Sequence, residues 1–281
     1  MEIQEIKKKV ETELKIQGKS AQTIRMYRFF LSKFYEFLKK DIDQATEDEI
    51  KEFLAYLISE KNYDLSSVSL AKSALKFTYH DFFKKNIMIQ IKTPKKQRKI
   101  PDILTKEEIL SMLKHAGSIR NKLLIEFMYS SGLRVSEVAK LRFSDVNLLE
   151  KSGLLKRGKG GKDRFFILSE VLIKDLEEYK KLVSNSDFIF PNREKNRPVT
   201  TRAIQDLIVR IAKKAQIKKH VHCHLLRHSF ATHLFESGTD IRIIQELLAH
   251  SNLQTTQFYT KVSKAQLKQV QSPLDSFLEE Y

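Results

Sequence analysis

The chain has 281 residues, a length that suits two ordinary domains better than one. Its one cysteine, Cys223, excludes an internal disulfide framework, and no apolar run approaches the roughly 20 residues that span a bilayer. The net charge of +16 favours a polyanionic partner, nucleic acid or an anionic membrane surface, although solubility alone can also account for it. Because residues 1–14 lack the apolar core of a signal peptide, we expect a cytosolic protein.

Residues 1–91 predict a small helical domain. Glycine and proline are scarce, and four helices are expected near 2–17, 20–39, 46–60 and 66–84. Ser20 and Thr46 are N-cap candidates, and Glu49 completes a capping box with Thr46. The second helix carries a stripe that indicates core packing rather than a base-stacking platform, namely Ile24, Tyr27, Phe30, Leu31, Phe34, Phe37 and Leu38.

Residues 92–101, KTPKKQRKIP, predict an extended linker because helices usually stop before prolines. The linker carries a net charge of +5, against +2 for residues 1–91 and +9 for residues 102–281. Four of its cations are candidates for phosphate contacts, namely Lys95, Lys96, Arg98 and Lys99. A merely solvated linker explains this charge equally well.

Residues 102–281 predict a second domain, mostly helical, which opens on the capping box TKEE at 105–108. A β-hairpin is expected where strands 154–157 and 164–168 flank the turn GKGGKD. Helices are expected near 105–115, 118–130, 134–140, 169–183, 200–215, 224–237, 240–249 and 263–270.

Two common kinds of phosphate and metal chemistry find no support in the sequence. There is no GxxxxGK[ST] loop, and the acidic residues form no clear metal-binding motif. Zinc must be considered because five histidines cluster around Cys223, but the HExxH glutamate and any cysteine pair are absent. Phosphoryl chemistry in this chain would therefore need cations from the protein itself.

Two short segments supply such cations. His224 and Arg227 are three residues apart in HLLRHSFATHL, so on a helix they share a face and can grip a phosphate. In SGLRVSE, Gly132 fits a helix end, Arg134 opens the next helix, and Glu137 can hold the guanidinium. Each feature alone is equally consistent with a structural role, since Arg–Glu pairs are common on surfaces.

Four further candidates lie in polar segments. Lys159 and Lys162 lie in the glycine-rich hairpin turn, where a lysine can contact phosphate or deliver a proton. His250 and Tyr259 lie in ELLAHSNLQTTQFYTKV, nine residues apart. Taken singly, a tyrosine near a chain end is more often structural than catalytic.

Taken in order, these motifs resemble the tyrosine recombinases, also called the phage integrase family, and the compact plan is similar to the Xer subgroup. GLRVSE, GKGGKDRF, HLLRHSFATHL, ELLAHS and TTQFYTKV carry the likeness, although many relatives have proline at Cys223 and glycine at Ala249. The resemblance implies six catalytic residues, which are Arg134, Lys159, His224, Arg227, His250 and Tyr259. The resemblance implies that the two arginines clamp the phosphate and that His250 donates a further hydrogen bond to it. Tyr259 would attack the phosphorus and form a 3′-phosphotyrosine. His224 would act as the base, and Lys159 would protonate the leaving oxygen.

The resemblance also implies an architecture and partners. The N-terminal domain is expected to be a four-helix SAM-like DNA-binding domain, and the C-terminal domain a catalytic one, together clamping double-stranded DNA without a cofactor or a membrane. Four protomers are expected on two DNA sites, with the tail 263–281 contacting a neighbour or packing on its own domain. A dif-like target, a paralogous recombinase and a septal DNA translocase are all compatible with the pattern. The alternatives are a mobile-element integrase, a type IB topoisomerase and a non-catalytic relative.

Overall fold

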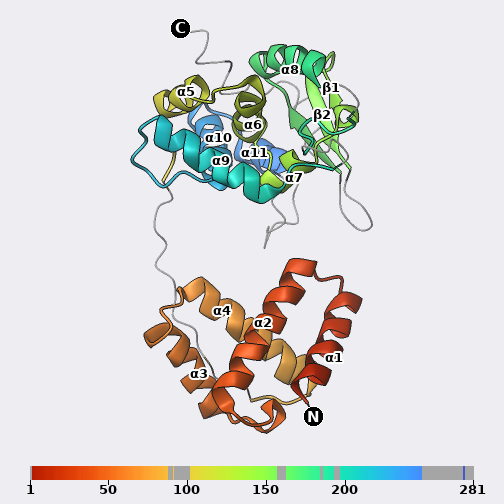
Figure 1. Ribbon diagram of the computed structural model, residues 1–281, viewed down its shortest axis with the longest axis vertical. Helices are drawn as coiled ribbons and strands as arrows, with labels where there is room; N and C mark the ends of the chain where they lie inside the picture. Colours follow the sequence, from red (N-terminus) through yellow and green to blue (C-terminus); the bar gives the residue numbers. More distant parts are fainter. Residues whose placement is uncertain are drawn as a thin grey trace. The chain divides into compact units, whose positions relative to one another are not determined.

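The computed structural model describes residues 2–87, 91, 102–156, 163–183, 186–192, 197–248 and 275. The chain forms two compact units, residues 1–100 and 101–281 (Figure 1). Both units are built mainly of helices, and the second contains a three-stranded antiparallel sheet. The predicted fold class, mainly α with a small sheet, is confirmed. None of the described helices is long and apolar enough to cross a membrane. The predicted linker 92–101 and the predicted helix 263–270 lie outside the described residues.

The described residues of the first unit form four α-helices, α1 (Ile3–Ile16), α2 (Ala21–Leu38), α3 (Glu47–Ser59) and α4 (Leu65–Lys76). Helix α2 packs against the other three (Figure 1). Its predicted apolar stripe faces this core: Ile24, Phe30, Leu31 and Phe34 are buried, and Tyr27, Phe37 and Leu38 pack against the cluster. The predicted caps are also present, because Ser20 accepts the Thr23 amide and Thr46 forms a capping box with Glu49.

The fourth helix differs from its prediction as one helix over 66–84. Helix α4 ends at Lys76, and the chain continues as a π-helix, η2 (Phe77–Phe82). Thr78 Oγ1 donates to the Ala74 carbonyl at 2.9 Å, and the Tyr79 hydroxyl donates to Ile42 O in the short 3-10 helix η1 (Ile42–Gln44). The Tyr79–Ile42 bond joins residues far apart in the chain, and π-helices are rare, so local periodicity does not predict this segment.

The second unit is organised around α10 (Cys223–Glu236), which packs against α6 (Ile119–Tyr129), α9 (Thr201–Lys214) and α11 (Ile241–Leu248). The other helices in the part of this unit that the structure describes are α5 (Lys106–Lys114), α7 (Val135–Lys140), the 3-10 helix η3 (Phe143–Asp145) and α8 (Glu170–Leu182). Helix α5 opens on the predicted capping box, in which Thr105 and Glu108 bond each other's backbone. The amphipathic helices thus enclose a core with α10 near its middle (Figure 1).

The sheet has strands β1 (Val146–Asn147), β2 (Ser152–Leu155) and β3 (Arg164–Ile167) in the order β1-β2-β3. The predicted hairpin is present as β2 and β3, but β2 begins two residues earlier than expected. Gly153 explains this register, because a Cβ there would lie 2.1 Å from the ring of its cross-strand partner Phe166. The two-residue strand β1 was not predicted, since it is too short to show a period. The turn GKGGKD lies mostly outside the described residues.

One buried carboxyl group predicts a stabilising substitution. Glu126 on α6 is fully buried. Lys122 Nζ lies 3.8 Å from Glu126 Oε1 but only 2.6 Å from Asp175 Oδ2 on α8. Burial, followed by the Asp175 charge, raises the pKa of Glu126 from 4.5 to about 9. At pH values between these two pKa values, Glu126 takes up a proton on folding, so the free energy of unfolding falls as pH rises. We expect Glu126→Gln to raise it by about 1–3 kcal/mol at pH 7, measured by urea denaturation.

The matched control is Glu177→Gln on the exposed face of α8, which we expect to leave stability unchanged. The difference between wild type and Glu126→Gln should also shrink as pH falls from 7 to 5, because the folded and unfolded wild-type chains then approach the same protonation state. A Glu126→Gln protein less stable than wild type at pH 8 would contradict a protonated Glu126.

Candidate active site

Gly132, in the turn between α6 and α7, brings the candidate residues together. Its φ is +59°, a left-handed conformation that disfavours side chains, and an added Cβ would lie 2.6 Å from the Phe230 ring. Its carbonyl oxygen accepts from the Arg164 guanidinium at 2.9 Å and from the Arg227 guanidinium at 2.5 Å. The predicted helix-end glycine therefore both ends α6 and aims a backbone acceptor at two buried cations.

Arg134 and Glu137 lie at the start of α7, as the SGLRVSE motif predicted. Arg134 is the N-cap residue, and its amide donates to Glu137 Oε2 at 2.8 Å. Its guanidinium donates to Glu137 Oε1 at 2.9 Å and to the Leu248 carbonyl, at the end of α11, at 3.3 Å. The side chains of Arg134 and Glu137 are 29% and 13% exposed. This pair is thus part of a partly buried network rather than a solvated surface pair.

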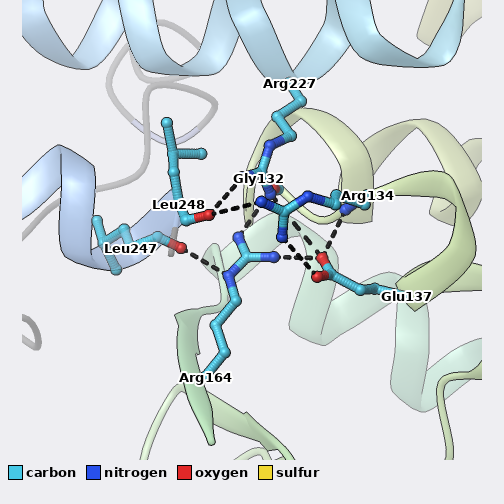
Figure 2. A network of polar contacts seen from close by, with 7 residues as sticks. All are labelled: Gly132, Arg134, Glu137, Arg164, Arg227, Leu247 and Leu248. Carbon is cyan, nitrogen blue, oxygen red and sulfur yellow. Dashed lines mark hydrogen bonds and ion pairs between the residues drawn. The ribbon is translucent and has the colours of Figure 1, made fainter. Parts of the chain in front are cut away.

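Arg227 reaches the same network from α10. Its side chain is 5% exposed, and it donates to the carbonyl oxygens of Gly132 and Leu248. Its Nη1 also lies 3.9 Å from Glu137 Oε2. Arg134 and Arg227 therefore share the Leu248 carbonyl and the Glu137 carboxylate, which holds the two guanidinium groups close together (Figure 2).

A third arginine, Arg164, was not among the predicted site residues. It begins β3, its side chain is 0% exposed, and it donates to Glu137 Oε2, to Gly132 O and to Leu247 O (Figure 2). One sequence signal could have found it: in the strand RFFI, Arg164 shares a face with Phe166, which the hydrophobic pattern places inward. A buried arginine needs partners, so such a position indicates a polar network.

The charges of this network suit an anionic ligand. Burial alone would raise the pKa of Glu137, but Arg164 and then Arg134 outweigh it and hold that pKa below its ordinary value of 4.5. One carboxylate and three guanidinium groups leave a net charge of +2. A phosphodiester carries one negative charge and gains more in the transition state of its cleavage, so this surplus matches that reaction.

His224 lies one turn before Arg227 on α10 and is exposed. Partial desolvation of its ring, and then the neighbouring Arg227 and Arg134 charges, lower the pKa of His224 below its ordinary value of 6.5. The imidazole is therefore neutral at neutral pH, the form in which it accepts a proton. Although Cys223 replaces the proline of many relatives, α10 begins there, because the His222 side chain accepts the Leu225 amide at 3.2 Å.

The histidine cluster does not assemble a metal site among the described residues. His222 caps α10, and His233 Nδ1 lies 2.7 Å from the Tyr129 hydroxyl. Within the described ranges, which include all five clustered histidines and Cys223, the structure brings no three His, Cys, Asp or Glu side chains together around a possible ion. The zinc alternative gains no support from this geometry.

The structure therefore places four of the predicted site residues, Arg134, Glu137, His224 and Arg227. The other predicted residues lie outside the described ranges: Lys95, Lys96, Arg98, Lys99, Lys159, Lys162, His250 and Tyr259. Their roles stay predictions.

Family profiles and relatives agree over most of the chain. The profile of the phage integrase family matches residues 102–266, and the profile of its N-terminal SAM-like domain matches residues 6–89. Tyrosine recombinase XerA of Pyrococcus horikoshii is 40% identical over 262 residues, covering 92% of this chain and 89% of the relative. Tyrosine recombinase XerD of Staphylococcus saprophyticus is 36% identical over 281 residues, covering 90% of this chain and 92% of the relative.

Solved structures show the same architecture. A XerA recombinase crystal structure has a TM-score of 0.53 and 31% identity, covering 95% of this chain and 96% of that one. XerH bound to its difH substrate has a TM-score of 0.69 and 25% identity, covering 90% and 80%. A lambda integrase dimer on a core site has a TM-score of 0.73 at 18% identity, covering 94% and 100%, which shows the fold alone.

Proposed function

Since this chain belongs to the phage integrase family and is an Xer-like site-specific tyrosine recombinase, we propose that it resolves chromosome dimers by cutting and rejoining DNA at a dif-like site. The observation that supports the chemistry is the pair Arg134 and Arg227, which share the Leu248 carbonyl and the Glu137 carboxylate. Two guanidinium groups held together in this way can clamp the non-bridging oxygens of one phosphate.

The other catalytic roles complete this proposal. Tyr259 attacks the phosphorus and forms a 3′-phosphotyrosine, and the 5′ oxygen leaves with a proton from Lys159. His224 takes the tyrosine proton, and His250 donates a second hydrogen bond to the phosphate. Covalent capture conserves the energy of the broken phosphodiester bond, so rejoining needs no ATP. Lys162 shares the turn of Lys159 and is the alternative proton donor.

The assembly is part of the same proposal. Residues 1–91 and 102–281 grip opposite faces of the DNA, joined by a linker whose Lys95, Lys96, Arg98 and Lys99 contact phosphates. Four protomers hold two sites, and a paralogous recombinase or a septal DNA translocase is a compatible partner. The tail 263–281 exchanges between protomers. The alternative, a tail that packs on its own domain, is favoured by one contact, in which Asp275 Oδ1 accepts the Glu170 amide of the same chain at 3.0 Å. A truncation after residue 262 that still assembles synaptic tetramers would contradict the exchange.

One experiment separates this function from its alternatives. Covalent Tyr259–DNA adducts are mapped across the host genome, and the recovered site is placed twice on a plasmid. We expect one adduct site per chromosome and exchange between the two plasmid copies. Adducts at the ends of mobile elements would indicate an integrase, and relaxation of supercoils without exchange would indicate a topoisomerase.

The lowered pKa of His224 predicts the pH dependence of cleavage. A protonated His224 cannot accept the tyrosine proton, so the rate falls as pH drops through the pKa of His224, and that midpoint lies below 6.5. The measurement is single-turnover cleavage at subsaturating protein, which reports on the free enzyme. His224→Gln should be slower and lose this acid limb. The same limb in the variant would assign it to another group.

Metal independence is the corresponding expectation for cofactors. The three arginines supply the positive charge that a divalent cation supplies in other phosphoryl transfers. We therefore expect strand cleavage in millimolar EDTA to proceed at the rate measured without it. Loss of cleavage that added Mg²⁺ or Zn²⁺ restores would show that the arginine clamp is insufficient.

A further inference from the structure

Arg164 is the most buried cation of the network and has no place in the six-residue set. Its side chain is 0% exposed, whereas that of Arg134 is 29% exposed. A side chain enclosed in this way cannot contact DNA. Arginine is costly to bury, so a position that keeps it must use its hydrogen bonds.

The donors of Arg164 reach three different elements. Its Nε donates to Leu247 O at the end of α11 at 2.8 Å, and its Nη2 donates to Gly132 O in the α6–α7 turn at 2.9 Å. Its Nη1 donates to Glu137 Oε2 on α7. A guanidinium reaches these acceptors from three separate nitrogens in one plane, whereas the three donors of a lysine all diverge from one nitrogen, so a lysine cannot reproduce this arrangement.

Two of these three acceptors also hold the arginines of the phosphate clamp. Gly132 O accepts from Arg227, and the Glu137 carboxylate accepts from Arg134 (Figure 2). The third acceptor, Leu247 O, is one residue before Leu248, whose carbonyl accepts from both Arg134 and Arg227. Arg164 thus fixes, from the buried side, the groups that orient the two clamp guanidiniums.

We propose that Arg164 is a positioning residue for strand cleavage. It fixes Gly132 O, Glu137 and the end of α11, so that the guanidinium groups of Arg134 and Arg227 are oriented toward the scissile phosphate. The inference rests on the proposed function, in which those two arginines form the clamp. Arg164 also links the clamp to two catalytic segments along the chain. It follows Lys162 by two residues, and Leu248 precedes His250 by two.

The loss of Arg164 has a defined consequence. Glu137 loses the cation that does most to hold its charge, and it then draws Arg134 and Arg227 more strongly. Their donors turn toward the carboxylate and away from the phosphate. Affinity for DNA depends on many phosphate contacts and barely changes, whereas the cleavage step slows.

The test compares Arg164→Lys and Arg164→Met in the full-length protein. The substrate is a nicked duplex with the recombination site recovered from the wild-type adducts. At saturating protein we expect cleavage to slow about 10-fold in Arg164→Lys and about 100-fold in Arg164→Met. The protein concentration that half-saturates the DNA should stay within about threefold of the wild-type value. Phe190→Leu, which removes buried packing in the same core, is the control for lost stability and should cleave at the wild-type rate.

A second substrate separates positioning from a merely structural role. A methylphosphonate at the scissile position replaces one charged non-bridging oxygen with a methyl group, so the clamp has less to hold. We expect the penalty of each Arg164 variant to shrink to within about threefold on this substrate. An equal penalty on both substrates, or none on either, would overturn the inference, and Arg164→Lys decides alone if Arg164→Met does not fold.

Arg134→Ala, assayed in parallel, separates a failure of the phosphate clamp from a failure of the positioning role of Arg164. If Arg134→Ala cleaves the ordinary substrate normally, the proposed clamp itself is wrong. If Arg134→Ala is crippled while both Arg164 variants cleave normally, the clamp stands and only the positioning role of Arg164 fails.

Discussion

Tyr259→Phe is expected to abolish strand cleavage while DNA binding stays at the wild-type level. Phenylalanine lacks the hydroxyl that attacks phosphorus, and the proposed set contains no second nucleophile to replace it. Binding is unaffected because it depends on many cationic contacts to phosphates along the duplex. The measurement is covalent protein–DNA adduct formation on a nicked substrate, with binding followed by gel shift.

Tyr56→Phe is the matched control, since Tyr56 is a half-buried tyrosine on α3 in the first unit. It should form adducts at the wild-type rate. Adducts formed by Tyr259→Phe would contradict the central assignment, and peptide mapping of those adducts would identify the true nucleophile.

Arg227→Ala is expected to slow cleavage by about 10³-fold or more, because the clamp loses a bidentate donor aimed at charge that develops in the transition state. The same change leaves the carbonyls of Gly132 and Leu248 without this donor, so we expect the second unit to lose about 2–4 kcal/mol of stability. Single-turnover cleavage at a temperature below the variant's melting transition measures the first effect, and urea denaturation measures the second.

Two further variants show which effect dominates. Arg227→Lys keeps the charge but loses the fork, and we expect it to recover most of the stability and little of the rate. Arg202→Ala on α9 removes an exposed arginine paired with Asp206 and should change neither quantity. Wild-type cleavage by Arg227→Lys would rule out a bidentate clamp at this position.

Local signals predicted much of the fold. Ser20, Thr46 and Thr105 marked helix starts correctly, because an N-cap depends on residues within one turn. The π-helix η2 and the strand β1 were missed. The first depends on contacts between distant residues, such as Tyr79 with Ile42, and the second is too short to carry a period.

The same division applies to the site. By itself the sequence determined which residue types the chain offers for chemistry, and that His224 and Arg227 share one helix and Arg134 and Glu137 another, because helical spacing is local. Only the tertiary structure decided what holds the arginines together. The carbonyls of Gly132, Leu247 and Leu248 carry no side-chain signal, and Arg164 lies far along the chain from Glu137 and Arg227. Their meeting depends on how α6, α7, α10, α11 and β3 pack, and packing between distant segments leaves no periodic mark in a sequence.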